Sequence, residues 1–272
     1  MDQYRVFGNP IEHSRSPFIH QSFARATKQQ LNYETQLAEL DGFTSAITEF
    51  ITQGGKGANV TVPFKEQALA ISDELTDRAR LAGAVNTLSF NEGKIVGDNT
   101  DGEGLVQDLL RNNVQVENSR ILLLGAGGAA KGVILPLLAQ NPANIIIANR
   151  TVSKADALIE QFNDGRLNSC SFEQASEKVY DLIINATSAS LSGKLPAISP
   201  DTITAKTVCY DMVYGKIQTP FLAWAKSKGA AKVIDGVGML VGQAAVSFHI
   251  WRGVKPEVAG VIEQLKLSLS QE

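Results

Sequence analysis

The stretch ILLLGAGGAAK, residues 121–131, decides the fold class of this chain. Its aliphatic run, 121–124, is typical of a strand buried on both faces of a parallel sheet. In the turn that follows, Gly125 would permit a tight bend, and Gly127 would let the backbone approach a pyrophosphate. Ala130 is small enough for close helix–strand packing, in place of a third glycine. The stretch predicts a dinucleotide-binding strand–turn–helix with phosphates at the helix N-terminus, and a tight turn without a ligand is the alternative.

The second strand of this fold, expected over 144–148, indicates which dinucleotide binds. An NAD site carries an acid at the end of that strand, about 20 residues past the turn, to accept from the ribose 2′-hydroxyl. Here the tripeptide Asn-Arg-Thr occupies 149–151, and the next acid is Asp156. The Arg150 guanidinium can bind a 2′-phosphate bidentately, and Lys154 would add a second positive charge. The sequence favours NADP over NAD, although Arg150 as a solvated strand-end residue is the alternative.

Strand-like and helix-like segments alternate on both sides of this turn. We expect strands at 4–7, 32–37, 58–62, 120–124, 144–148, 181–185, 207–211 and 233–235, and a β-hairpin over 87–97. We expect helices after Ser16-Pro17, at 43–51, from about 66 into the early 80s, at 104–111, from the glycine turn to about 139, at 153–162, and twice between 239 and 272. This alternation predicts an α/β fold: a Rossmann-type doubly wound parallel sheet domain and a second α/β substrate domain, with a cleft between them.

Composition excludes several classes of function. The 272 residues have a formal net charge of −3, which gives no reason to expect nucleic acid or an anionic membrane as a partner. Cys170 and Cys209 are far apart, which predicts a reducing, cytoplasmic location, and the polar N-terminus does not resemble a signal peptide. The histidines lack ligand spacing, so we expect no metal; they are His13, His20 and His249.

Polar residues in the first hundred positions gather at the expected ends of strands and helices. Ser14 and Ser16 stand at a helix start, where they would bind a substrate carboxylate or only cap the helix. Lys65 follows an expected strand, where open α/β sheets bind ligands, although a surface lysine is the alternative. Asp101 precedes a helix, so it is either a site residue or an N-cap.

These motifs together resemble the shikimate dehydrogenase family over nearly the whole chain. The matching segments are Gly8-Asn9-Pro10, Ser14-Arg15-Ser16-Pro17, Asn59-Val60-Thr61-Val62-Pro63-Phe64-Lys65, Gly83-Ala84-Val85-Asn86-Thr87, Gly97-Asp98-Asn99-Thr100-Asp101-Gly102, residues 125–130, Asn149-Arg150-Thr151, Asn185-Ala186-Thr187-Ser188, Tyr210-Asp211-Met212-Val213-Tyr214 and Gly238-Met239-Leu240-Val241-Gly242-Gln243-Ala244. The resemblance implies reversible NADPH-dependent reduction of 3-dehydroshikimate to shikimate, a step towards chorismate and the aromatic amino acids. It also implies a discontinuous substrate domain, 1–101 with 238–272, around an NADP domain, 102–237.

The resemblance also implies roles for individual residues. Lys65 and Asp101 would be the catalytic pair, and which of them donates the proton stays open. The substrate would be bound by Ser14, Ser16, Asn59, Thr61, Lys65, Asn86, Asp101, Tyr214 and Gln243. NADP would be bound by Asp77, Gly125, Ala126, Gly127, Gly128, Ala129, Asn149, Arg150, Thr151, Lys154, Ser188, Met212 and Gly236.

Three alternatives to this function stay open. The nearest is a quinate/shikimate dehydrogenase of the same family that uses NAD, against which Arg150 argues. A glutamyl-tRNA reductase would need further domains and a basic surface. An NADP-binding regulatory protein would have no need of both Lys65 and Asp101. The chain is expected to act as a monomer or homodimer.

Overall fold

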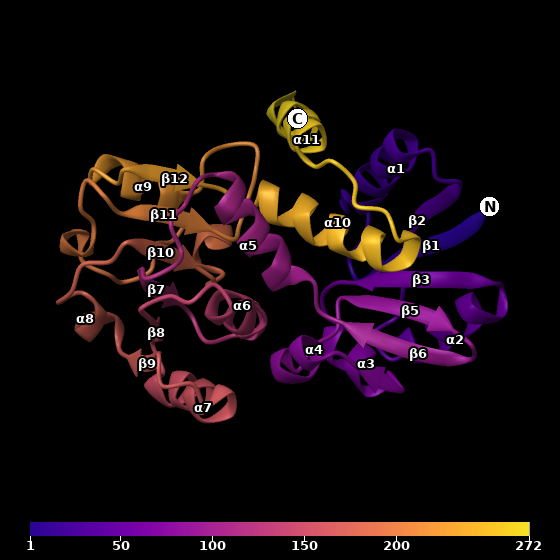
Figure 1. Ribbon diagram of the computed structural model, residues 1–272, viewed down its shortest axis with the longest axis horizontal. Helices are drawn as coiled ribbons and strands as arrows, with labels where there is room; N and C mark the ends of the chain where they lie inside the picture. Colours follow the sequence, from indigo (N-terminus) through magenta and orange to yellow (C-terminus); the bar gives the residue numbers. More distant parts are fainter. Residues whose placement is uncertain (272) are drawn as a thin grey trace. The chain divides into compact units, whose positions relative to one another are not determined.

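The computed structural model describes residues 1–271, and they form two compact units (Figure 1). One unit consists of Met1–Gly104 with Leu240–Glu263, and the other of Leu105–Met239 with the chain from Gln264 onward. The two crossing points lie a few residues beyond those expected at 101 and 237. The expectation kept 238–272 together, whereas the structure groups the segment from Gln264 with the second unit.

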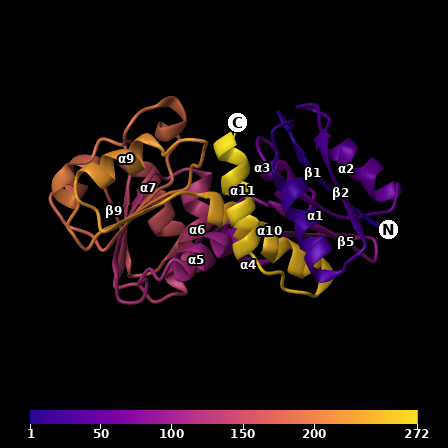
Figure 2. The ribbon, with the colours of Figure 1, turned by 90° about the horizontal axis from the view of Figure 1, so that it is seen from above.

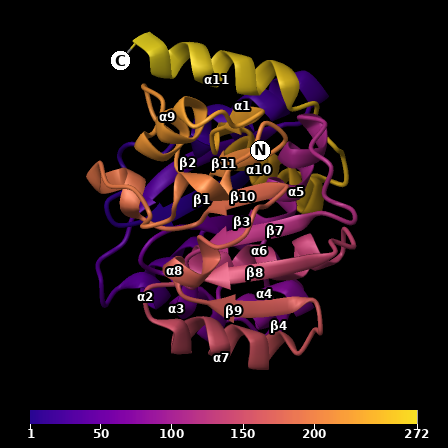
Figure 3. The same ribbon diagram turned by 90° about the vertical axis from the view of Figure 1, so that its left-hand side faces the viewer.

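The second unit is built on a fully parallel six-stranded sheet. Its strands are β7 (Arg120–Leu124), β8 (Asn144–Ala148), β9 (Leu167–Cys170), β10 (Leu182–Asn185), β11 (Val208–Asp211) and β12 (Lys232–Ile234), in the order β12-β11-β10-β7-β8-β9. Figure 3 shows β10, β7, β8 and β9 following one another across the sheet. In this sheet β7 comes first in sequence, and β8 and β9 follow on one side of it. The next strand, β10, lies on the other side of β7, followed by β11 and β12. This is the Rossmann order, and its switch point lies between β7 and β10.

Helices cover both faces of this sheet. The helices α5 (Asp101–Arg111, from Leu105 on), α6 (Gly128–Leu138) and α7 (Val152–Phe162) supply one core, which contains Ile121 and Leu123. The short helix α8 (Phe172–Ala175) and α9 (Pro220–Ser227) supply the other, which contains Leu122 and Leu124. The aliphatic run does not alternate because both of its faces are buried, and each such side chain stabilises the fold by about 1.5–3 kcal/mol. Two 3₁₀ helices, Ala189–Ser192 and Pro200–Thr202, lie in the connections.

The first unit has a mixed six-stranded sheet. Its strands are β1 (Asp2–Gly8), β2 (Leu31–Leu37), β3 (Gly55–Val60), β4 (Glu74–Leu75), β5 (Thr87–Asn91) and β6 (Lys94–Asp98), in the order β2-β1-β3-β5-β6-β4. Only β5 runs antiparallel to its neighbours, β3 and β6. The predicted β-hairpin is confirmed, and both turn residues, Glu92 and Gly93, have the positive φ that a tight hairpin turn favours.

Two layers of helices enclose this sheet as well. The helices α2 (Phe43–Thr52), α3 (Lys65–Ala70) and α4 (Asp77–Ala82) pack on one face through a core that includes Phe7, Val60 and Leu88. On the other face, α1 (Ser16–Thr27) and the part of α10 (Val237–Arg252) from Leu240 on supply aromatic contacts. Figure 2 shows β1 and β2 between α2 and α1.

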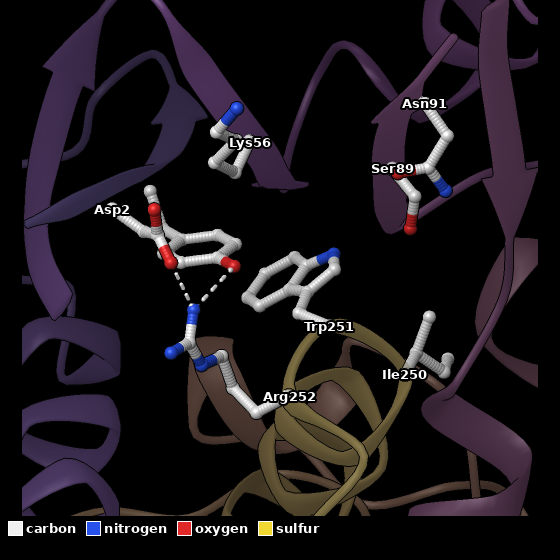
Figure 4. Close-up of a pocket in the computed structure, with 8 residues that line it drawn as sticks. Asp2, Lys56, Ser89, Asn91, Ile250, Trp251 and Arg252 are labelled. Atoms are coloured by element: carbon white, nitrogen blue, oxygen red, sulfur yellow. Dashed lines mark hydrogen bonds and ion pairs between the residues drawn. The ribbon is translucent and has the colours of Figure 1, made fainter. Parts of the chain in front are cut away.

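Side-chain contacts hold the C-terminal end of α10 against the sheet (Figure 4). The Arg252 guanidinium points at the Asp2 carboxylate and at the Tyr4 hydroxyl. The Trp251 ring stacks on Tyr4 at 4.7 Å, and its Nε1 donates to the Leu88 carbonyl at 3.1 Å. A Cβ at Gly57 would lie 2.5 Å from that Nε1, so only glycine admits the indole there. These contacts fix the helix that carries Gln243 and Ser247.

Some predicted elements differ from the structure. The single helix expected from residue 66 into the 80s is two short helices with β4 between them, because the Thr76 side chain caps a new helix by accepting from Ala79 N–H. Arg15, not Ser16, is the N-cap of α1. The two helices expected between residues 239 and 272 are confirmed as α10 and α11 (Ala259–Gln271). Among residues 1–271, no helix combines the length and the apolarity that a membrane crossing requires.

Candidate active site

Strand direction brings distant polar residues of the first unit to one sheet edge. Because β5 is antiparallel, Thr87 at its start pairs with Asn59 near the end of β3 and with Asp98 at the end of β6. The loops after β3 and β6 therefore meet the segment before β5. Lys65 begins α3 after the first loop, and Asp101 begins α5 after the second.

Lys65 and Asp101 form a half-buried ion pair. The Lys65 Nζ lies 2.5 Å from Asp101 Oδ2, with the two side chains 30% and 21% exposed. The other oxygen, Asp101 Oδ1, accepts from Asn86 Nδ2 at 2.8 Å. Both carboxylate oxygens thus face donors, which is the arrangement of an ionised acid and an ammonium. An amine held in this way can donate a proton to a ligand that binds beside it.

The remaining expected substrate residues of this unit lie at or near the same edge. Gln243, on α10, places Oε1 3.3 Å from Asn86 Nδ2. Ser14 and Ser16 follow β1, the neighbour of β3, and Ser14 Oγ accepts from the Ser16 N–H at 3.3 Å. The Ser16 N–H is therefore already bonded, and Pro17 has no N–H, so the first turn of α1 offers fewer donors to an anion than an open helix start does. Thr61 follows β3 directly.

Asn59 differs from the other candidates because it lies beneath them. It is 5% exposed, and its amide bonds to Tyr33, to Ser247 and to the Asn86 carbonyl. Tyr214 belongs to the second unit, in the loop after β11, and is half-buried. Asp77 is exposed in the first turn of α4.

The histidine nearest to this network is an aromatic core residue. His20 is fully buried and stacks on Tyr33 with centroids 4.2 Å apart. Burial lowers the pKa of His20 to about 3, so the ring is neutral. Residues 1–271 contain no cluster of three or more His, Cys, Asp or Glu side chains that could hold a metal ion.

The glycine turn of the second unit contains two kinds of glycine. Gly125 has φ +104°, and a Cβ there would lie 3.2 Å from Thr187 Cγ2, so the fold itself requires glycine. A Cβ at Gly127 or Gly128 would meet nothing within 4 Å, so the fold does not require glycine at either position. The open backbone at 127–129 lies at the N-terminus of α6, where an added side chain would fill a phosphate's place. These residues fit the pyrophosphate of a dinucleotide.

The end of β8 presents positive charge. Arg150 and Lys154 are exposed around the first turn of α7, and the Thr151 hydroxyl makes no capping bond. Asn149 Nδ2 donates to the Thr151 carbonyl at 2.9 Å, which shapes this turn. The nearest downstream acid, Asp156, accepts instead from Ser169 on β9. This group of residues fits a 2′-phosphate.

A buried polar network supports the loops after β10 and β11. Two of its residues, Asn185 and Asp211, lie in segments that match the family, but the sequence assigned them no role. The Asp211 carboxylate accepts from Ser190 at 2.7 Å, Thr219 at 2.6 Å and Asn185 at 3.1 Å. Burial raises the pKa of Asp211, and these donors oppose that rise. Asn185 and Asp211 are the last residues of β10 and β11, and polar residues at the carboxyl ends of expected strands were the signal in the sequence.

The candidates at the nicotinamide end lie in or beside these loops. Ser188 is exposed in the loop after β10, and Met212 follows β11. A Cβ at Gly236 would lie 2.2 Å from the Met212 carbonyl oxygen, so glycine there allows the two backbones to meet. Ala126 is half-buried against the core, and Ala129 is exposed beside Gly128.

Three family models match successive parts of the chain. They describe a shikimate dehydrogenase substrate-binding domain at residues 6–88, a shikimate/quinate 5-dehydrogenase domain at 107–194, and a shikimate 5′-dehydrogenase C-terminal domain at 236–266.

Full-length relatives agree with these models. A shikimate dehydrogenase (NADP(+)) from Colwellia psychrerythraea is 64% identical over 268 residues, which cover 98% of this chain and 98% of the relative. One from Vibrio cholerae is 56% identical and covers 99% and 97%. The crystal structure of shikimate 5-dehydrogenase from Thermus thermophilus, in complex with NADP(H) and shikimate, is similar with a TM-score of 0.89 at 32% identity, covering 99% and 100%. Because the fold, the motifs and these relatives agree over the full chain, this protein belongs to the shikimate dehydrogenase family.

Proposed function

We propose that this chain is an NADP-dependent shikimate dehydrogenase, which reversibly reduces 3-dehydroshikimate to shikimate on the route to chorismate and the aromatic amino acids. The observation that carries the proposal is the Lys65–Asp101–Asn86 group at the carboxyl edge of the first unit's sheet. The relatives named for this NADP-dependent activity match the chain at 54–64% identity.

Ketone reduction needs a hydride at carbon and a proton at oxygen. NADPH, when bound, supplies the hydride and leaves as NADP⁺. We assign the proton to Lys65 Nζ, since both oxygens of its partner, Asp101, already accept hydrogen bonds. The Asp101 carboxylate holds the ammonium in place and can also accept from a substrate hydroxyl. In the reverse direction Lys65 takes up the proton that it gave.

The substrate contacts follow from the edge on which these groups lie. We assign the substrate carboxylate to Ser14 and Ser16, whose hydroxyls lie at or just before the start of α1 and can donate to an anion. Tyr214 is assigned to the substrate from its family motif alone. We assign the ring hydroxyls to the polar side chains around Lys65, which are Thr61, Asn86, Asp101 and Gln243.

NADP is assigned to the second unit. Open backbone from Gly125 to Ala129 suits the pyrophosphate, and the surface of Asn149, Arg150, Thr151 and Lys154 suits the adenosine 2′-phosphate. Ser188, Met212 and Gly236 are assigned to the nicotinamide end. Asp77 stays a weaker candidate, since only its position in the family motif supports it.

We also propose a cytoplasmic enzyme that acts as a monomer or homodimer and binds neither nucleic acid nor membranes. Its two cysteines, Cys170 and Cys209, are free, which suits a reducing compartment. Burial raises the pKa of both thiols, so neither is a reactive thiolate.

Steady-state kinetics with two cofactors and two substrates test the function. We expect the highest kcat/KM for shikimate with NADP⁺, because a carboxylate able to hold the NAD ribose is absent from residues 149–151. A preference for NAD⁺ with quinate would instead establish the quinate/shikimate alternative. Tight NADPH binding by a folded protein without turnover of either substrate would establish the regulatory one.

A further inference from the structure

A chain of polar side chains runs beneath the Lys65–Asp101 pair, from the aromatic core to Asn86. We call it the polar chain, and it consists of Tyr33, Asn59, Ser247, Thr87 and Asn86. Its members come from β2, β3, α10, the start of β5 and the residue before it. All five are nearly or fully buried, with at most 5% exposed.

Backbone groups determine how both amides of the polar chain point. Asn59 Nδ2 lies 3.1 Å from the Asn86 carbonyl oxygen, which can only accept, so Asn59 Oδ1 faces the Tyr33 hydroxyl at 2.7 Å. The Thr100 N–H, which can only donate, lies 2.9 Å from Asn86 Oδ1. Asn86 Nδ2 is therefore the group that faces Asp101 at 2.8 Å.

The hydroxyls between the two amides then have one direction of donation. Asn59 Nδ2 has two protons and lies 3.1 Å from three acceptors, which are the Asn86 carbonyl, Ser247 Oγ and Thr87 Oγ1. Thr87 Oγ1 lies 2.8 Å from Asn86 Oδ1, where it can only donate. Since that uses the only proton of Thr87, only Ser247 can donate across the 2.8 Å separation of the two hydroxyls, and it shares that proton with the Gln243 carbonyl at 3.1 Å.

Each link therefore orients the next, from Tyr33 to Asp101. The Thr87 and Ser247 side chains are 1% and 0% exposed, so bulk water does not replace a lost hydroxyl. Without the Thr87 proton, Asn86 Oδ1 keeps only its contacts with Thr100. The amide then loses one of the three donors that hold Oδ1, so its Nδ2 is held less firmly on the Asp101 carboxylate.

We propose that Thr87 and Ser247 are positioning residues, which hold the Asn86 N–H on Asp101 and thereby keep the carboxylate aligned with Lys65. They act only through Asn86, since among the described contacts neither hydroxyl bonds to Lys65 or Asp101. The inference rests on the proposed roles of Lys65 and Asp101, and it extends the site to two residues outside the substrate contacts.

A double-mutant cycle between Thr87 and Asn86 tests the proposal. Thr87→Val keeps the shape and removes the hydroxyl, and we expect kcat to fall about tenfold with an unchanged NADPH KM. In an Asn86→Ala background the same substitution should change kcat by less than about twofold, since the group it orients is gone. Thr87→Ser restores the hydroxyl and should restore kcat.

Ser247→Ala provides a second, independent perturbation, with Ser22→Ala as its matched control. Both serines are buried on helices and bond to the carbonyl four residues earlier, but Ser22 lies outside the polar chain. Ser247→Ala should lower kcat, whereas Ser22→Ala should change only the melting temperature. If Thr87→Val does not fold, the Ser247→Ala cycle with Asn86→Ala takes its place.

The outcomes separate this inference from the proposed function. Additive losses in the cycle, or equal effects of Ser247→Ala and Ser22→Ala on kcat, would overturn the positioning role while wild-type turnover still supports the function. An inactive but folded wild-type protein would overturn both. Non-additive losses with rescue by Thr87→Ser support the proposal.

Discussion

The two kinds of glycine in the turn after β7 lead to a prediction that separates folding from cofactor binding. Gly127→Ala is expected to fold as well as the wild type, because its Cβ would meet no protein atom within 4 Å and its φ of −89° suits alanine. Alanine gains about 0.4–1 kcal/mol by restricting the unfolded chain, but Gly127 is the N-cap of α6, where alanine is less favourable than glycine, and the two effects oppose each other. The free energy of unfolding without cofactor should therefore stay close to the wild-type value.

The same methyl group would occupy the surface on which the pyrophosphate is proposed to lie. Losing one charge-assisted hydrogen bond from a backbone N–H costs about 1.5–3 kcal/mol. We therefore expect the Kd for NADPH to rise roughly 10- to 100-fold. The substitution should thus weaken NADPH binding without a matching loss of stability.

Gly125→Ala is the matched control in the same turn. Its φ of +104° strains any other residue, and the Cβ would press on Thr187 at 3.2 Å, so we expect a loss of about 1–3 kcal/mol of stability. Urea unfolding without cofactor and fluorescence titration with NADPH measure both quantities for each variant. Wild-type NADPH affinity in Gly127→Ala would refute the placement of the pyrophosphate, and a stability loss equal to that of Gly125→Ala would refute the geometry of the turn.

Three further predictions address the charges. Arg150→Ala should raise the NADPH KM about 10-fold or more with little change in the NADH KM, and equal effects on both cofactors would place the 2′-phosphate elsewhere. Lys65→Ala should lower kcat by about 10²–10⁴-fold with little change in the substrate KM, and wild-type turnover would remove Lys65 from catalysis. Burial raises the pKa of Asp98, but hydrogen bonds from Arg78 and Thr76 outweigh it and hold the pKa below its usual value. The ionised Asp98 carboxylate therefore stabilises the fold above about pH 4, and this stabilisation is lost as pH falls through the lowered pKa. In urea unfolding, Asp98→Asn should cost about 3 kcal/mol at pH 7 and less at pH 3. A cost that does not depend on pH would contradict the ion pair between Asp98 and Arg78.

The strands of the nucleotide fold were predictable because burial on both faces gives them a recognisable aliphatic pattern in the sequence. The strands at 120–124 and 144–148 are confirmed to the residue, since aliphatic runs buried on both faces contain no polar interruption. In contrast, β9 was missed because its four residues, LNSC, include one apolar side chain of core size and lie at the sheet edge. Helix α9 was also missed, although Thr219-Pro220 carries the same start signal as Ser16-Pro17.

The sequence predicted which residues belong to the candidate site, but not which of them contact one another. The Lys65–Asp101 contact links residues 36 positions apart, and it depends on the antiparallel direction of β5, which periodicity does not encode. The polar chain could not be predicted from the sequence for a related reason. Ser247 is a single serine in a largely apolar helix, and its link to Thr87 spans 160 positions.

The most direct test of the function is the oxidation of NADPH by the purified chain when 3-dehydroshikimate is added. We expect a loss of NADPH absorbance that depends on both reactants, with one shikimate formed for each NADPH consumed. A folded protein that binds NADPH but leaves 3-dehydroshikimate unchanged would contradict this function.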